Sequence, residues 1–212
     1  MNFQSNMINW FAILGMVFLF PSCGDFIYDK DNGEDVVITE GSFSMVNASA
    51  YTTWVYINLE TLEAVAVEEY SGNNEITVPE EWHFALHRFD CKTNGGAVME
   101  TAYSSLEELL DSGNIPDGEF TEDVITDDVI AYDMSGMMEG IIIYAESDYN
   151  TELSKWMNVD LSVMPPIYTA SNKVYLIRMK DGSLAAVRFT DFIGPSEVKG
   201  YVSFEFIYPF SR

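Results

Sequence analysis

Val163 to Phe192 read VMPPIYTASNKVYLIRMKDGSLAAVRFTDF, and the second half of this stretch predicts a β-hairpin. Residues 173–179 and 184–190 are rich in β-branched and aromatic residues, which suit a pleated strand. Between them, Asp181-Gly182 predicts a tight turn with two positive-φ positions. We therefore expect two neighbouring antiparallel strands of one sheet here.

The rest of the chain from Val36 onward predicts more short strands, separated by turn residues. We expect them at residues 36–39, 43–46, 51–58, 62–69, 82–89, 120–125, 129–134, 141–145, 155–161 and 201–208. The last of these strands follows the hairpin, so three strands should form a meander. One helix is expected at the capping box Ser105-Leu106-Glu107-Glu108, and Gly113 should end it. The 212 residues predict an all-β fold in a single antiparallel domain with one short helix.

The composition limits the classes of function. Ten Lys and Arg residues stand against 34 Asp and Glu residues, a net charge of -24, which argues against nucleic acid or anionic membrane as a partner. Apolar residues make up 48% of the chain, which predicts a folded core. Because no nucleophile motif, zinc spacing, phosphate loop or dinucleotide fingerprint occurs, we do not expect an enzyme.

The N-terminal segment predicts export. Residues 10–20 form an apolar run that is too short to span a bilayer but long enough for a signal peptide. Cys23 follows in a bacterial lipobox-like context, which predicts a signal peptide over 1–22, a lipidated acidic tether over 23–35 and a folded domain over 36–212. An ordinary signal sequence or a misassigned start is the alternative. If Cys23 is lipidated, Cys91 is left without a partner cysteine and should be a small buried hydrophobic residue.

Two blocks of sequence, in a fixed order, resemble the HmuY family of haem-binding lipoproteins of Bacteroidetes. The first block is WHFALHRFD at 82–90 with GGAV at 95–98, and the second is YTASNKV at 168–174 with DG at 181–182 and VRFTDF at 187–192. The resemblance implies an HmuY-type β-rich domain, haem (iron protoporphyrin IX) as the bound group and a lipid-anchored place on the outer-membrane surface. It also implies that haem is taken from host haemoproteins and passed to a TonB-dependent outer-membrane receptor.

The resemblance also suggests axial haem ligands. The family pattern places two ligand histidines in loops, and this chain lacks both of them. Methionine stands at the matching points, which makes Met137, or its neighbour Met138, and Met164 the candidate iron ligands. Most of the 11 methionines should be core residues, but these lie in loops rich in Gly or Pro; Pro165-Pro166 makes the second loop stiff. A thioether is neutral and soft, so it favours ferrous iron.

Aromatic and cationic residues near the two loops are candidates for the haem pocket. Those that could line it, or equally pack within the sheet, are Tyr144, Tyr149, Trp156, Ile167 and Tyr168. Lys155 and Lys173 are the nearest cations for the propionates, although each could be an ordinary surface lysine.

The two histidines of the chain, His83 and His87, are not expected to bind iron together. On a strand, residues four apart are separated by about 13 Å, so the two side chains cannot converge on one metal. We expect His87 to be a structural residue near the core and His83 to be exposed.

Two other functions stay open at the level of sequence. The chain could be an HmuY-like interaction or adhesion module that does not bind haem, or it could bind another tetrapyrrole. Release from the cell, or transport in vesicles, is an alternative to a permanent place on the outer membrane.

Overall fold

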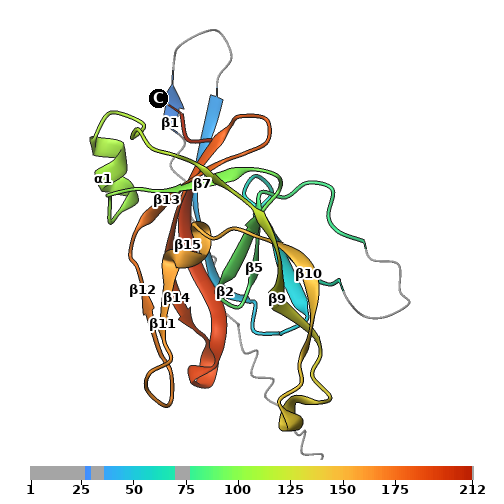
Figure 1. Ribbon diagram of the computed structural model, residues 1–212. Coiled ribbons are helices and arrows are strands. Elements are labelled where there is room, and N and C mark those ends of the chain that lie inside the picture. Colours follow the sequence, from blue (N-terminus) through green and yellow to red (C-terminus); the bar gives the residue numbers. More distant parts are fainter. Residues whose placement is uncertain (1–26, 30–35, 70–76, 212) are drawn as a thin grey trace, which may run out of the picture.

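The computed structural model describes residues 27–29, 36–69 and 77–211, which fold into antiparallel sheets (Figure 1). The largest sheet has seven strands in the order β1-β2-β15-β14-β13-β7-β8. Its strands are β1 (Ile27–Asp29), β2 (Val36–Asn47), β7 (Ala97–Glu100), β8 (Thr121–Glu122), β13 (Val174–Arg178), β14 (Leu184–Ile193) and β15 (Lys199–Tyr208).

A four-stranded sheet and two separate hairpins complete the β-structure. The four-stranded sheet has the order β4-β3-β5-β6, with β3 (Thr53–Asn58), β4 (Glu63–Glu68), β5 (Phe84–His87) and β6 (Asp90–Thr93). The hairpins pair β9 (Val124–Asp133) with β10 (Ile143–Tyr149), and β11 (Met157–Asp160) with β12 (Ile167–Ala170). The helical segments are α1 (Leu106–Asp111) and the short 3-10 helices η1 (Met137–Glu139), η2 (Leu153–Trp156) and η3 (Pro195–Glu197).

The main core lies between the seven-stranded and four-stranded sheets, and the alternation of side chains explains it. Tyr175 and Ile177 of β13 share a buried cluster with Val55 and Ile57 of β3. The intervening residues of β13, including Leu176, face the other way and pack with α1. The continuous apolar run of β13 is therefore that of a strand covered on both faces.

The outer face of the four-stranded sheet is covered by the β9–β10 hairpin and encloses a buried lysine. Trp54 and Tyr56 pack there with residues of β9 and β10. The Lys92 ammonium lies 4.6 Å from the centre of the Trp54 ring and 5.0 Å from that of Tyr56. It donates hydrogen bonds of 3.0 Å to the Tyr56 hydroxyl and to a carboxylate oxygen of Glu69. The partners therefore compensate for the burial of this charge.

Both two-stranded hairpins project from the same end of the molecule. Figure 1 shows β9–β10 and β11–β12 extending past the lower end of the seven-stranded sheet, one on each side of the β14–β15 loop. We call this region the hairpin end. Neither hairpin is hydrogen-bonded into a larger sheet, so each is held to the body by side-chain packing.

Several expectations from the sequence are confirmed. The fold is β-rich and antiparallel, and β13, β14 and β15 are neighbours in a meander. The capping box begins α1, because the Ser105 hydroxyl accepts a hydrogen bond of 3.1 Å from the Glu108 N–H group. Cys91 is fully buried.

Other expectations were wrong in detail. Only Gly182 of the hairpin turn has a positive φ, because the Asp181 carboxylate accepts the Ser183 N–H group at 2.9 Å and stabilises a different turn. The strand expected at 155–161 begins only at Met157, because the Asn150 side chain accepts the Leu153 N–H group at 2.8 Å and starts η2. Residues 36–39 and 43–46 form one strand, β2.

The expected signal peptide and the lipidation site Cys23 lie outside the described residues. Within the expected tether, Ile27–Asp29 form β1 and pair with β2. Among the helices that the structure describes, none is long and apolar enough to cross a membrane.

Candidate functional site

The hairpin end contains a hollow beside the β11–β12 hairpin. It has a volume of about 170 Å³ and lies between that hairpin and the adjoining ends of β14 and β15. Its lining is mainly apolar, with one cation, and consists of Met157, Tyr168, Ala170, Thr190, Asp191, Phe192, Ile193 and Lys199.

A second hollow of about 290 Å³ lies beside the β9–β10 hairpin. The hairpin contributes Met134, Met137 and Tyr144, and the segment after β5 contributes Arg88 and Phe89. The remaining lining residues are Tyr51, His87, Asp90, Asp128, Val129, Ala131 and Ile142. Each hollow is smaller than the usual range for drug-sized ligands, about 300 Å³ and above.

Phe89 connects the two hollows. Its ring centre lies 6.2 Å from that of Tyr168 and 6.1 Å from that of Phe192, and the Tyr168 and Phe192 rings stack at 5.3 Å. We call Phe89, Tyr168 and Phe192 the aromatic floor. Phe89 and Tyr168 are partly buried and Phe192 is 3% exposed, so the three rings form an apolar base between the two hairpins, against which a large flat apolar molecule could pack.

The local backbone holds Phe89 in place. The preceding residue, Arg88, has a positive φ of 53°, and its N–H group donates to the Ala48 carbonyl at 2.7 Å. The Trp156 indole N–H group donates to the Phe89 carbonyl at 2.8 Å. A non-glycine residue in the left-handed region is uncommon, and these contacts stabilise it.

The structure places the candidate methionine ligands at the tips of the two hairpins. Met137 and Met138 lie in η1, with 49% and 88% of their side chains exposed, and Met164 is 89% exposed in the loop between β11 and β12. Met137 lines a hollow and Met164 does not. In Figure 1 the tips of the two hairpins stand apart on opposite sides of the hairpin end.

The aromatic candidates have different environments. Tyr144 and Tyr168 line the two hollows. Ile167 is exposed on β12 and lines neither hollow. Trp156 is buried in the core, where its ring stacks on Phe189 at 4.4 Å. Tyr149, which is half-buried at the end of β10, also lines neither hollow.

The cations beside the hollows are not the lysines suggested by the sequence. Lys155 pairs with Glu152, and the Lys173 ammonium donates to the Ala102 carbonyl at 3.2 Å; neither lines a hollow. Lys199 lines the first hollow, with its ammonium 4.1 Å from the centre of the Tyr168 ring. Arg88 lines the second, with its guanidinium 4.5 Å from the centre of the Tyr51 ring.

His87 behaves as the sequence predicted and His83 does not. His87 is buried, with its Nε2 atom 3.1 Å from the Tyr51 carbonyl oxygen and its Nδ1 atom 3.4 Å from the Asp90 carboxylate. His83 was expected to be exposed, but only 9% of it is accessible. The strand β5 begins after it, at Phe84, and the Leu59 N–H group donates to its Nδ1 atom at 3.1 Å.

Sequence reasoning missed Arg88, Phe89, Phe192 and Lys199 as members of the site. Arg88, Phe89 and Phe192 lie within the matched blocks, at the ends of strands, and that position was a usable signal. Nothing in the local sequence marks Lys199. In the described part of the chain, no group of three or more His, Cys, Asp or Glu side chains is placed to hold a metal ion.

Comparison with known proteins identifies relatives of the chain. A family model described as "HmuY protein" matches residues 50–206. A Bacteroides vulgatus protein of known structure, described as HmuY-like and haem-binding, is 47% identical with a TM-score of 0.75, over 82% of this chain and 93% of that one. No curated protein sequence matches the chain.

Two further crystal structures are similar. A Bacteroides fragilis protein described as a lipoprotein is 45% identical with a TM-score of 0.73, over 89% of this chain and 96% of that one. The apo form of the Tannerella forsythia HmuY analogue is 25% identical with a TM-score of 0.69, over 82% of this chain and 97% of that one. The residues matched by the family model, 50–206, include both hairpins.

Proposed function

This chain belongs to the HmuY family, and on that premise we propose that it binds haem at the hairpin end, between the β9–β10 and β11–β12 hairpins. The observation that carries the proposal is the aromatic floor of Phe89, Tyr168 and Phe192, flanked by two hairpins with methionines at their tips. A porphyrin is a large apolar plate, so contact with aromatic rings would supply much of the binding free energy.

The axial ligands in this proposal are Met137, with Met138 as the alternate, and Met164. These residues are exposed, and the tips of the two hairpins stand apart in Figure 1, so ligation of one iron would require the hairpins to approach each other. The separation of both hairpins from the larger sheets permits such a movement. Two neutral soft ligands would favour ferrous over ferric iron.

Arg88 and Lys199 are the proposed partners of the haem propionates, in place of Lys155 and Lys173. Both line the hollows beside the aromatic floor. With a net charge of -24, the chain as a whole repels the propionates, so nearby cations matter more than they would in a neutral protein.

The test is a haem titration of the soluble chain from Gly24, followed by absorption spectra under air and after addition of dithionite. Met137→Ala and Met164→Ala are the informative variants, with Met138→Ala to separate the neighbours. Met45→Ala is the matched control, because Met45 is 54% exposed on β2 and lines neither hollow. We expect sharp low-spin ferrous bands in the wild type and the control, weakened in the ligand variants.

Other spectral outcomes identify the alternatives. Spectra that match free haem in both oxidation states would overturn haem binding and favour an interaction module. Equal affinity for iron-free protoporphyrin, with no effect of Met137→Ala or Met164→Ala, would indicate a tetrapyrrole site without iron ligation.

The proposed setting is a lipid-anchored protein on the outer-membrane surface. Thr39 of β2 pairs with Tyr208, whereas Asn47 pairs with Tyr201, so the N-terminal side of β2 lies away from the hairpin end. In this setting the chain would take haem from a host haemoprotein.

Transfer of haem to a TonB-dependent receptor is the proposed next step. Incubation of the haem-loaded chain with outer membranes that contain or lack the candidate receptor would test it. Receptor-dependent loss of the haem spectrum from the soluble fraction is the expected result, and equal loss to both membranes would contradict it.

A further inference from the structure

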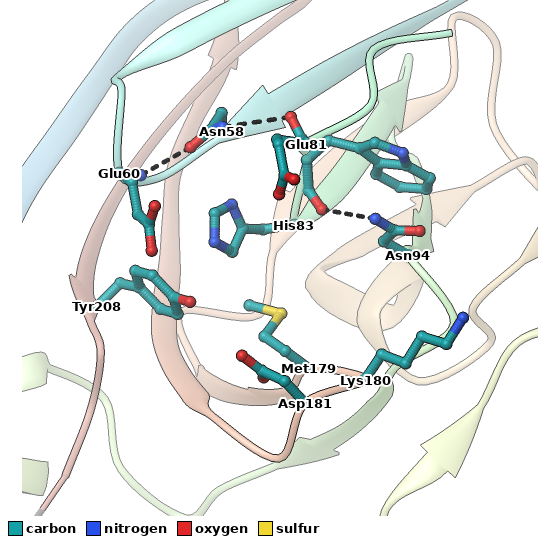
Figure 2. Close-up of a pocket in the computed structure, with 10 residues that line it drawn as sticks. Asn58, Glu60, Glu81, His83, Asn94, Met179, Lys180, Asp181 and Tyr208 are labelled. Carbon is teal, nitrogen blue, oxygen red and sulfur yellow. Dashed lines mark hydrogen bonds between the residues drawn. The ribbon is translucent and has the colours of Figure 1, made fainter.

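A polar pocket lies at the opposite end of the molecule from the hairpins. It has a volume of about 240 Å³ and is built from tight turns of both main sheets. Figure 2 shows His83 in the pocket between Glu60, Glu81 and Asp181, with Tyr208 and Met179 below it. Because these residues come from both sheets, the packing of the sheets forms the pocket before any ligand binds.

His83 has one unused hydrogen-bond donor in this pocket. Its Nδ1 atom accepts the Leu59 N–H group at 3.1 Å, so the proton of the neutral ring must be on Nε2. Burial lowers the pKa of His83, although Glu60, Asp181 and Glu81 oppose this effect, so the ring is neutral near pH 7. Within the described parts of the chain, the Nε2–H group has no hydrogen-bond partner, although the residue is only 9% exposed. A ligand with an acceptor atom would satisfy it.

The pocket also contains three carboxylates, and one oxygen of Asp181 already accepts the Ser183 N–H group at 2.9 Å and the Ser183 hydroxyl at 2.7 Å. Among the described residues, the carboxylates of Glu60, Glu81 and Asp181 form no ion pair. Each nearby amide already uses one of its two donors, because Asn58 donates to the Glu81 carbonyl at 3.2 Å and Asn94 donates to the Trp82 carbonyl at 3.0 Å. The occupant must therefore supply several donors and at least one acceptor.

The simpler ligand classes do not fit this set of groups. Anions would be repelled, because Lys180 alone faces three carboxylates. A metal ion is disfavoured because, in the described residues, these carboxylates are not close enough to share one. A lysine or arginine side chain from a partner would satisfy the carboxylates but has no acceptor atom for the His83 Nε2–H group.

A saccharide meets all of the requirements. Each hydroxyl group both donates and accepts, so a sugar ring can donate to the carboxylates and accept from His83. Its C–H faces can pack on an aromatic ring, and Tyr208 and Trp82 border the pocket. We propose that this pocket binds a neutral monosaccharide unit, free or at the end of a glycan, through His83 Nε2–H, Glu60, Glu81 and Asp181.

This site is separate from the proposed haem site. The ten residues of β14 run from Leu184, which follows the turn at Asp181, to Ile193 beside the aromatic floor. At about 3.3 Å per residue, they span about 30 Å. Saccharide and haem should therefore bind at the same time, and a variant of one site should leave the other intact.

The test uses a panel of neutral hexoses and N-acetylhexosamines as methyl glycosides, with saturation-transfer NMR to detect binding and calorimetry to measure it. The central variant is His83→Asn, because the shorter side chain can still accept the Leu59 N–H group but has no donor at the Nε2 position. Glu60→Gln removes one charge with little change of shape. Glu119→Gln, an exposed glutamate outside the pocket, is the matched control.

The expected result is saturable binding of at least one glycoside, about tenfold weaker in His83→Asn and in Glu60→Gln and unchanged in the control, since each variant loses about one hydrogen bond. Haem titration and thermal unfolding of the same variants should match the wild type, which shows that the fold is intact. Absence of binding across the panel, or binding that neither pocket variant changes, overturns the proposal. Methylguanidinium binding that Glu60→Gln removes and His83→Asn leaves intact would assign the pocket to a cationic side chain.

Discussion

The two ends of the molecule present opposite kinds of surface. At the hairpin end, large apolar side chains are exposed, with Met138 at 88% and Met164 at 89%. At the other end, the pocket around His83 encloses polar and charged groups, and its only imidazole is 9% exposed. One end exposes groups that favour an apolar ligand, and the other encloses groups that favour a polar one.

The difference arises from how each end is connected to the core. The two hairpins pair only within themselves, so their tip residues have no second layer to cover them. The pocket is built from turns that side-chain hydrogen bonds fix, such as the one that the Asn58 side-chain oxygen Oδ1 accepts from the Glu60 N–H group at 2.9 Å. The haem site proposed at the hairpin end requires the hairpins to approach each other, whereas the pocket is formed before the ligand arrives.

Both ends depend on a stable body between them. The largest effect that we predict concerns the buried ion pair of Lys92 and Glu69 in that body. Glu69→Gln leaves the buried Lys92 ammonium without its charged partner, so we expect the free energy of unfolding to fall by about 3–5 kcal/mol. The double variant Glu69→Gln/Lys92→Met should recover most of this loss, because the uncompensated charge is gone. Urea unfolding measures both. A loss below about 1 kcal/mol in Glu69→Gln would mean that the pair does not stabilise the body.

The second prediction tests whether Met137 and Met164 bind the haem iron at the hairpin end. The double variant Met137→His/Met164→His replaces soft thioethers with imidazoles, which stabilise ferric iron better. We expect its ratio of ferrous to ferric haem affinity to fall by about a hundredfold relative to the wild type, equivalent to about 2.7 kcal/mol. Spectroelectrochemical titration measures this as a lower reduction potential. An unchanged potential would show that these methionines do not bind the iron.

A smaller effect on haem affinity should separate the cations that line the hollows from the lysines that the sequence suggested. Arg88→Ala and Lys199→Ala should each weaken haem binding about fivefold at low salt, because each removes a partly exposed charge beside the floor. Lys155→Ala and Lys173→Ala are the comparison variants and should have little effect. Titration at two salt concentrations checks the electrostatic origin. Equal losses of haem affinity in all four variants would mean that only the overall charge of the protein matters.

The smallest effect is a pH dependence at the polar end. Burial lowers the pKa of His83, so below about pH 6.5 the unfolded chain takes up a proton there that the folded chain does not. The free energy of unfolding should therefore fall with decreasing pH in that range, by no more than about 1.4 kcal/mol per pH unit. His83→Asn lacks this contribution but keeps Glu60, Glu81 and Asp181. Parallel curves for wild type and variant between pH 7 and 5 would contradict the prediction.

Much of the architecture could be predicted from local patterns. Alternating apolar residues indicated most strands, and the capping box at Ser105 indicated α1. The boundaries failed where one side chain changed the local geometry, as Asn150 does at η2. The candidate site was predicted less well: the sequence located Tyr144 and Tyr168, but it could not show that Trp156 turns into the core.

By itself, the sequence determined the antiparallel β-fold, the family and the loops that carry the methionines, because these depend on local periodicity and short motifs. Only the tertiary structure decided that Phe89 meets Phe192, that Lys199 covers Tyr168 and that His83 is buried. The physical reason is that a strand pattern defines two faces but does not say which face meets which. Packing between segments far apart in the chain makes that choice, and both proposed sites depend on it.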